Sequence, residues 1–243
     1  MLIDLMKKSI PDYETTLPIS KKQIRFRPLL VKEEKYISEI MELSNNISEK
    51  IYCLSKLVDS CCDTHINSMN ISIYDFQHIL TEIRRKSINE VLNIKINCPY
   101  TGESIPVQIN LDELILNKFH PEKKMNFLVN DTIQITFDLP KVSDLIKTNG
   151  EFKTQSGFKK LVSLCLTGVE TKKEKIDLNL YSDEDKEQFI DLLSRTDYDE
   201  IRKFLLNGLY KFNVSYITSD GIGREVVVAD FINFLKFYLA TLI

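Results

Sequence analysis

Residues 70–110 constrain the fold more than any other stretch, because they predict an amphipathic helix followed directly by a β-hairpin. Apolar residues recur at helical spacing from Ile73 to Ile83, which indicates a helix with one buried face. Ser72 precedes this helix and can cap its first turn through its side-chain oxygen. Asp75, three residues later, matches the acidic position of a capping-box variant, with its carboxylate over the amides of the first turn.

The predicted hairpin turns at residues 98–102, Cys98-Pro99-Tyr100-Thr101-Gly102. Apolar and polar residues alternate on both sides of this turn, which is typical of strands with one buried face. The helix and the hairpin cannot cover both apolar faces by themselves. The rest of the chain must therefore pack over them.

Composition narrows the class of protein. The chain has 243 residues, 43% of them hydrophobic and 28% charged, as in an ordinary globular protein. Its net charge of -3 argues against nucleic acid as the main partner, because phosphate binding needs a basic surface. The odd number of cysteines and the absence of a signal-peptide pattern favour reduced thiols in a cytoplasm. We expect no membrane span, since the most apolar run, residues 231–243, is too short and contains Lys236.

We divide the chain into three regions. Residues 1–22 form an N-terminal arm, residues 23–147 a first domain of helices and β-hairpin, and residues 148–243 a second domain of the same kind. Each domain has helices, then a strand, a tight turn and a strand. This order predicts an α+β fold with helices packed on small antiparallel hairpins, in two loosely repeated halves.

Three local predictions concern the second half. The charged segment from Glu170 to Lys175 is expected to be a loop. Gly208 follows a predicted helix as its C-terminal cap, a position that favours glycine. A final apolar helix is expected from about Asp230, docked on the body or exposed as a contact surface.

No motif in the sequence predicts catalysis or a cofactor. The histidines lack a neighbouring nucleophile motif, and Gly221-Ile222-Gly223 lies in a predicted hairpin turn, outside a strand-to-helix context. Zinc would need four ligands, whereas Cys61, Cys62 and His65 cluster at a helix end and Cys98 has no partner cysteine in its turn. We therefore expect no catalytic residue, no cofactor, no metal ion and no small-molecule substrate.

Two segments of the opening region carry a family resemblance. The sequences IRFRP at 24–28 and VKEEK at 31–35 resemble the opening of the T4-type bacteriophage baseplate hub assembly protein family. Residues 75–91 resemble the central helix of that family, and Asn97-Cys98-Pro99 resembles its hairpin. The resemblance covers most of the chain from about residue 20 onward.

The resemblance implies a non-enzymatic role in assembling the central hub of a phage tail baseplate, through contacts with other baseplate hub or tail proteins. It implies a location in the host cell cytoplasm during assembly or in the baseplate of the virion. One alternative is a permanent structural subunit of the baseplate. Another is a degenerate zinc-ribbon-like binding module. The sequence leaves the oligomeric state open.

Eight charged residues match the family motif. They have two interpretations: a partner-binding surface, or an internal network of ion pairs between the opening segment and the helix that follows Ser72. The eight are Arg25, Arg27, Lys32, Glu33, Glu34, Lys35, Arg84 and Lys86.

Overall fold

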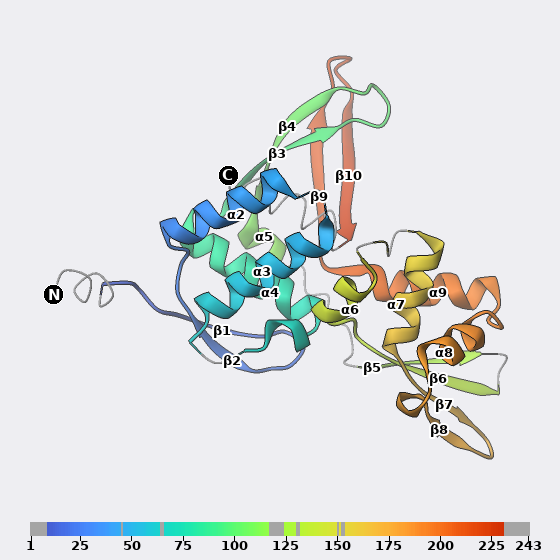
Figure 1. The fold of residues 1–243 in the computed structure, drawn as a ribbon. Helices are drawn as coiled ribbons and strands as arrows, with labels where there is room; N and C mark the ends of the chain where they lie inside the picture. The colour runs from blue at the N-terminus through green and yellow to red at the C-terminus, as the bar shows by residue number, and fades with distance from the viewer. Residues whose placement is uncertain are drawn as a thin grey trace.

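The computed structural model describes residues 9–44, 46–63, 66–116, 124–129, 132–149, 151 and 154–230. Within these ranges the protein has an α+β fold, with helices packed on antiparallel sheets of two to four strands, as the sequence predicted. Figure 1 shows three parts: a helical group, a strand arm that projects from it, and a second group of helices and strands beside it.

The chain opens with two short antiparallel strands, β1 (Tyr13–Thr16) and β2 (Gln23–Phe26). Leu17, in the turn between them, is buried, and Tyr13 lies opposite Phe26 in the register. The described half of the predicted N-terminal arm therefore lies on the body of the protein. Residues 1–8 of that arm are outside the described residues.

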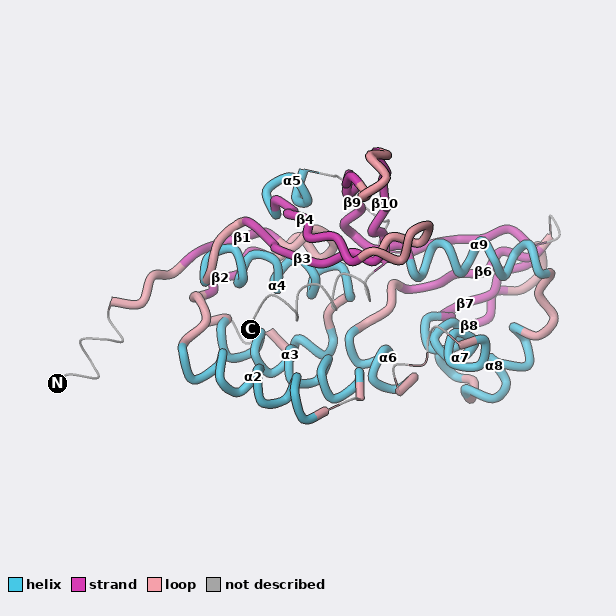
Figure 2. Tube along the Cα trace, turned by 90° about the horizontal axis from the view of Figure 1, so that it is seen from above, coloured by secondary structure: helices cyan, strands magenta, loops and turns pink. Residues whose placement is uncertain are grey.

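Three helices form the first group. Figure 2 shows α4, the last of the three, between a layer formed by α2 and α3 and the strands on its opposite side. Its buried residues occupy nearly its whole circumference, including the polar Gln77 and Thr81, as expected of a helix covered on both sides. The helices are α2 (Val31–Leu43), α3 (Ile47–Cys61) and α4 (Ile73–Ser87). A single 3-10 turn, η1 (Ser68–Asn70), connects α3 to α4.

Helix α4 is the element predicted from its apolar spacing. The Ser72 side chain accepts a hydrogen bond from the Asp75 amide at 3.1 Å and caps its first turn. Its apolar face is fully covered, and burial of each such side chain contributes about 1.5–3 kcal/mol. The residues of this face are Ile73, Phe76, Ile79, Leu80 and Ile83.

Two hairpins from distant parts of the chain form the projecting arm (Figure 1). Their shared interior holds Ile94, Ile96 and Val214, all buried. The hairpins consist of β3 (Val91–Asn97) with β4 (Ser104–Asn110), and β9 (Asn207–Ile217) with β10 (Gly223–Asp230). A short helix, α5 (Leu111–Leu116), follows β4 at the base of the arm.

The third part is a four-stranded antiparallel sheet with helices packed beside it. The strands, in their order in the sheet, are β5 (Lys124–Val129), β6 (Ile133–Asp138), β7 (Leu166–Thr171) and β8 (Lys175–Asp177). The 3-10 turn η2 (Leu178–Leu180) follows β8. The helices are α6 (Val142–Lys147), α7 (Gln155–Cys165), α8 (Asp183–Ile190) and α9 (Arg195–Leu206).

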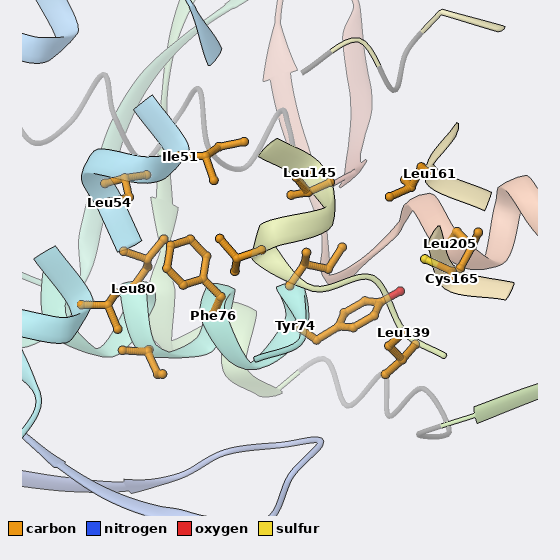
Figure 3. Close-up of a cluster of buried hydrophobic side chains, with 14 of the residues drawn as sticks. Ile51, Leu54, Tyr74, Phe76, Leu80, Leu139, Leu145, Leu161, Cys165 and Leu205 are labelled. Atoms are coloured by element: carbon orange, nitrogen blue, oxygen red, sulfur yellow. The ribbon is translucent and has the colours of Figure 1, made fainter. Parts of the chain in front are cut away.

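One buried cluster runs from the helical group into the third part. Figure 3 shows Phe76 and Leu80 at one end and Leu161, Cys165 and Leu205 at the other. Tyr74 lies between them, and its hydroxyl donates to the Phe204 carbonyl at 3.3 Å. This cluster packs α4 against α6, α7 and α9 in a single core.

Two predictions for the second half can be compared with the structure. The predicted loop from Glu170 to Lys175 is too long, because Glu170 and Lys175 are paired residues of β7 and β8 and only residues 172–174 form the turn. Gly208 lies two residues after the end of α9 at Leu206 and already belongs to β9, and its role as a helix cap stays a prediction. The predicted final helix is outside the described residues beyond Asp230.

The domain boundary at residue 147 and the internal duplication stay predictions. The four-stranded sheet combines strands from before and after that boundary, since β6 pairs with β7. Both predicted halves contribute one hairpin to the arm.

Candidate functional site

The strongest ion pair among the eight predicted residues joins Arg27 to Glu33. Arg27 follows β2, and Glu33 lies in the first turn of α2. The guanidinium contacts both carboxylate oxygens, Nη1 to Oε2 at 2.9 Å and Nη2 to Oε1 at 2.7 Å. This bidentate geometry fixes the two side chains more firmly than a single contact would.

The same pair also binds the end of α3. Arg27 donates to the Ser60 carbonyl at 2.9 Å, and Glu33 accepts from the Ser60 hydroxyl at 3.2 Å and from the Leu30 amide at 2.9 Å. Burial would raise the pKa of Glu33, but the hydrogen bonds from Arg27 and Leu30 outweigh it and lower that pKa. The hydrogen bonds that Arg27 donates to Glu33 raise the pKa of Arg27. The pair therefore stays charged and holds the opening segment against α2 and α3.

The other four residues of the opening motif lie nearer the surface. Arg25 pairs with Glu14 at 2.7 Å, with both side chains more than half exposed. Lys35 lies 3.9 Å from Glu39 on the outer side of α2. Lys32 is exposed and Glu34 is half-buried. Exposed ion pairs of this kind contribute little to stability. Because these side chains are exposed, a partner could reach them.

The two predicted residues on α4 make different contacts. Arg84 is buried and donates from Nη1 to the Asn89 carbonyl at 3.0 Å. Lys86 places its ammonium group 4.9 Å from the centre of the Tyr13 ring in β1. Lys86 thus connects α4 to the opening segment through a cation–π contact.

Sequence reasoning missed the main connections between α4 and the opening segment. The Asp75 carboxylate accepts from the Ile19 amide at 2.8 Å and the Ser20 amide at 3.1 Å. The prediction that this carboxylate covers the first turn of its own helix was therefore wrong. His78 bonds the Thr15 hydroxyl at 2.8 Å through Nε2. The residues around Asp75 suggested a local capping role. Nothing in them pointed to the contact with Ile19 and Ser20.

The tips of the two arm hairpins are joined to each other. Glu103, at the end of the first turn, accepts hydrogen bonds from the backbone amide and the hydroxyl of Ser219 in the second turn. Both turns contain a glycine with positive φ, Gly102 at 73° and Gly221 at 77°. Residues with a side chain rarely adopt this backbone conformation, so glycine is favoured at both turns.

Arg224 of β10 makes the second connection between the tips. Its guanidinium lies 3.7 Å from the Cys98 sulfur, 2.6 Å from the Asp220 carboxylate and 5.0 Å from the centre of the Tyr100 ring. Burial would raise the pKa of the Cys98 thiol, but hydrogen bonds from Thr101 and Tyr216 outweigh it and lower that pKa to about 7. The Cys98 sulfur is therefore held by hydrogen-bond donors from both hairpins, with the Arg224 guanidinium beside it.

Apolar side chains are exposed at this joined end of the arm. Tyr100 is 80% exposed, Ile217 71% and Ile222 53%. They belong to two hairpins that are far apart in the sequence. The contacts of Glu103 and Arg224 hold both turns in one place. Tyr100 stacks on Arg224, on the face of the β9–β10 hairpin that carries Tyr216, whereas Ile217 lies on the opposite face.

The described residues do not fit a structural zinc site. Among them, no three histidine, cysteine or acidic side chains gather closely enough to hold one metal ion. Thr101 stands where a second cysteine of the turn would be needed, and the Arg224 guanidinium faces the Cys98 sulfur. Burial raises the pKa of Cys61 to about 11 and that of Cys62 to about 12, whereas zinc binds the thiolate. His65 lies outside the described residues.

Within the described part of the chain, no helix combines the length and the apolar character that a bilayer crossing requires. Searches of curated proteins and of solved structures found no match. A family model described as T4 bacteriophage base plate protein matches residues 10–236, which include the opening motif, α4 and both arm hairpins. The chain therefore belongs to the T4 bacteriophage base plate protein family.

Proposed function

We propose that the protein serves assembly of the central hub of the tail baseplate, by contacts with other baseplate hub or tail proteins and without catalysing a reaction. The family match over residues 10–236 carries this proposal, because members are baseplate proteins. In this role the protein acts in the host cytoplasm while the baseplate is built.

Two features of the structure support a role in protein contacts. The buried charged pair of Arg27 and Glu33 is occupied in holding elements of the body together. Apolar side chains at the tip of the projecting arm, in contrast, are exposed. Burial of such side chains against another protein removes apolar area from water and favours binding.

The test is a binding assay of the full chain against each individually purified baseplate protein of the same phage, together with a phage from which the gene is deleted. We expect a specific complex with at least one hub or tail protein, and deletion phage that accumulate incomplete hubs in electron micrographs. Normal hubs in the deletion phage would overturn the proposal.

A permanent structural subunit is the second candidate, because the family description names a baseplate protein without separating assembly from residence in the particle. Quantitative mass spectrometry of purified virions distinguishes the two. A stoichiometric amount in the virion favours the permanent subunit. Absence from virions, with hubs that fail to form in the deletion phage, favours an assembly factor that leaves.

A further inference from the structure

We propose that the protein pairs with a second copy of itself through the outer edge of β8 (Lys175–Asp177), so that the four-stranded sheet continues across a two-fold axis. The inference goes beyond the proposed function and does not depend on it, because it concerns the chain alone. The family description gives no oligomeric state.

The first observation is an edge strand with no neighbour on its outer side among the described residues. The strand order is β5-β6-β7-β8, so β8 ends the sheet. Figure 1 shows it at the border of the third part of the molecule. An edge strand presents backbone N–H and C=O groups that can pair with another strand.

The register identifies the backbone groups that face outward. The Thr171 amide donates to the Glu174 carbonyl at 2.7 Å, which makes these two residues a hydrogen-bonded pair of the β7–β8 hairpin. Hydrogen-bonded and non-hydrogen-bonded pairs alternate along an antiparallel ladder, so Lys175 and Asp177 do not bond β7 through their backbone. Their N–H and C=O groups therefore point away from the sheet.

The second observation is that the charges of this edge complement those of its own copy. In an antiparallel pair centred on Ile176, Lys175 lies opposite Asp177 of the second copy, and the same contact repeats across the axis. Each of these pairs can exchange two backbone hydrogen bonds and brings opposite charges together. A parallel pair with the same centre would bring like charges together. Charge therefore selects an antiparallel second copy for this edge.

Asp177 forms no ion pair within the described part of its own chain. Its carboxylate accepts from the backbone amide and the side-chain amide of Asn179, both at 2.9 Å, and the residue opposite it in β7 is Gly168. Lys175 lies 3.0 Å from Glu170 and its side chain is 80% exposed. Lysine on an edge strand commonly keeps other strands away. Here the second copy supplies an acid opposite the lysine, so charge favours the pairing.

The third observation concerns the segments on either side of β8. Exposed Lys172 and Lys173 lie in the turn before it. After it, Leu180 and Tyr181 are 85% and 48% exposed. Three exposed acidic residues then begin α8: Asp183, Glu184 and Asp185. Because the two-fold axis reverses the direction of the second strand, the basic turn of one copy approaches the segment that follows β8 in the other.

The test is a charge exchange across the axis, measured by sedimentation equilibrium of the purified full chain. We expect a concentration-dependent equilibrium between monomer and dimer in the wild type. Lys175→Glu and Asp177→Lys each create two pairs of like charges across the axis, so each should raise the dissociation constant at least about tenfold.

An equimolar mixture of the two variants should dimerise like the wild type, because each pair of like charges becomes a pair of opposite charges in the mixed dimer. The double variant Lys175→Glu/Asp177→Lys should dimerise again for the same reason. Recovery in the mixture would exclude misfolding as the cause of the loss.

Lys35→Glu is the matched control, because the Lys35 side chain is 79% exposed and lies 3.9 Å from Glu39 on α2. It should leave the dissociation constant unchanged. A wild type that stays monomeric up to millimolar concentration overturns the inference. A dimer that neither single variant weakens also overturns it, as does a mixture that fails to recover or an equal loss in the control. The assay contains no baseplate protein, so none of these results decides the proposed function.

Discussion

The helical body and the tip of the arm use the same residue types in opposite ways. Around α4, apolar side chains are fully covered, and at the end of α3 the partly buried Arg27 and Glu33 satisfy one another. At the tip, Arg224 pairs with Asp220 and Glu103 accepts from Ser219, but apolar side chains are exposed. We therefore expect the body to set stability and the tip to contribute little to it, and substitutions should separate the two regions.

The largest difference should come from removing one apolar side chain in each region. Phe76→Ala leaves a cavity in the core beside α3 and should lower the free energy of unfolding by about 3–5 kcal/mol. Ile222→Ala at the tip should change it by less than about 0.5 kcal/mol. Urea unfolding of both variants measures the difference. Similar losses at the two positions would contradict the separation.

The next effect concerns the two ion pairs of the opening segment. Arg27→Met leaves the Glu33 carboxylate without its cation in a mostly buried site, and should cost about 3 kcal/mol. Arg25→Met removes an exposed pair with Glu14 and should cost no more than about 1 kcal/mol. Denaturant midpoints with unchanged slopes would establish both values.

The pH dependence of stability should report His78, whose pKa burial lowers to about 4. In the unfolded chain histidine titrates near 6.5, so between these values only the unfolded state holds the proton and stability is lost as the pH falls. Lowering the pH from 7 to 5 should cost about 2 kcal/mol. Asp75, whose pKa burial raises, acts in the opposite direction.

The variant His78→Gln isolates this contribution, because its amide can still bond Thr15 but does not titrate. It should lose less stability than the wild type between pH 7 and pH 5 in parallel urea titrations. Equal losses in both proteins would exclude His78 as the titrating group.

One substitution in the body should raise stability. The Gln77 side chain is fully buried in α4, and neither its amide nitrogen nor its amide oxygen has a hydrogen-bond partner within the described residues. Gln77→Met keeps the length and removes the unsatisfied groups, so the free energy of unfolding should rise by about 1–2 kcal/mol. The neighbouring Thr81→Val should not, because the Thr81 hydroxyl donates to the Gln77 carbonyl.

The smallest effect on stability should come from Glu103→Ala, which removes one of the two connections between the tips. The unfolding midpoint should stay unchanged, because the contact lies on the exposed end of the arm. Amide exchange at residues 98–103 and 217–223 should become faster, since each turn keeps only the Arg224 contacts to the other. A lowered global midpoint would show that the arm contributes to the stability of the body.

Local patterns were enough to predict the elements that repeat a simple period. Helix α4 and the turn at 98–102 follow from apolar spacing and turn residues. Strand β1 was missed, because the sequence of Tyr13–Thr16 carries little apolar alternation and the strand depends on pairing with β2. The β7–β8 hairpin was missed because its turn is rich in charge.

The candidate site depended more on distant contacts. Glu103 and Ser219 are 116 residues apart, and no local signal links them. The connection of Asp75 to Ile19 is of the same kind. The opening motif led us to consider a charged network between the opening segment and α4. In the structure Arg27 pairs with Glu33, and this pair is joined to the end of α3.

The most direct test of the account is amide hydrogen exchange of the full chain in its native state, compared with its free energy of unfolding in urea. The account predicts that the amides of α4 exchange only on global unfolding, whereas residues 98–103 and 217–223 exchange through local opening at a much lower free energy. Opening free energies at the hairpin turns equal to those of α4 would contradict it.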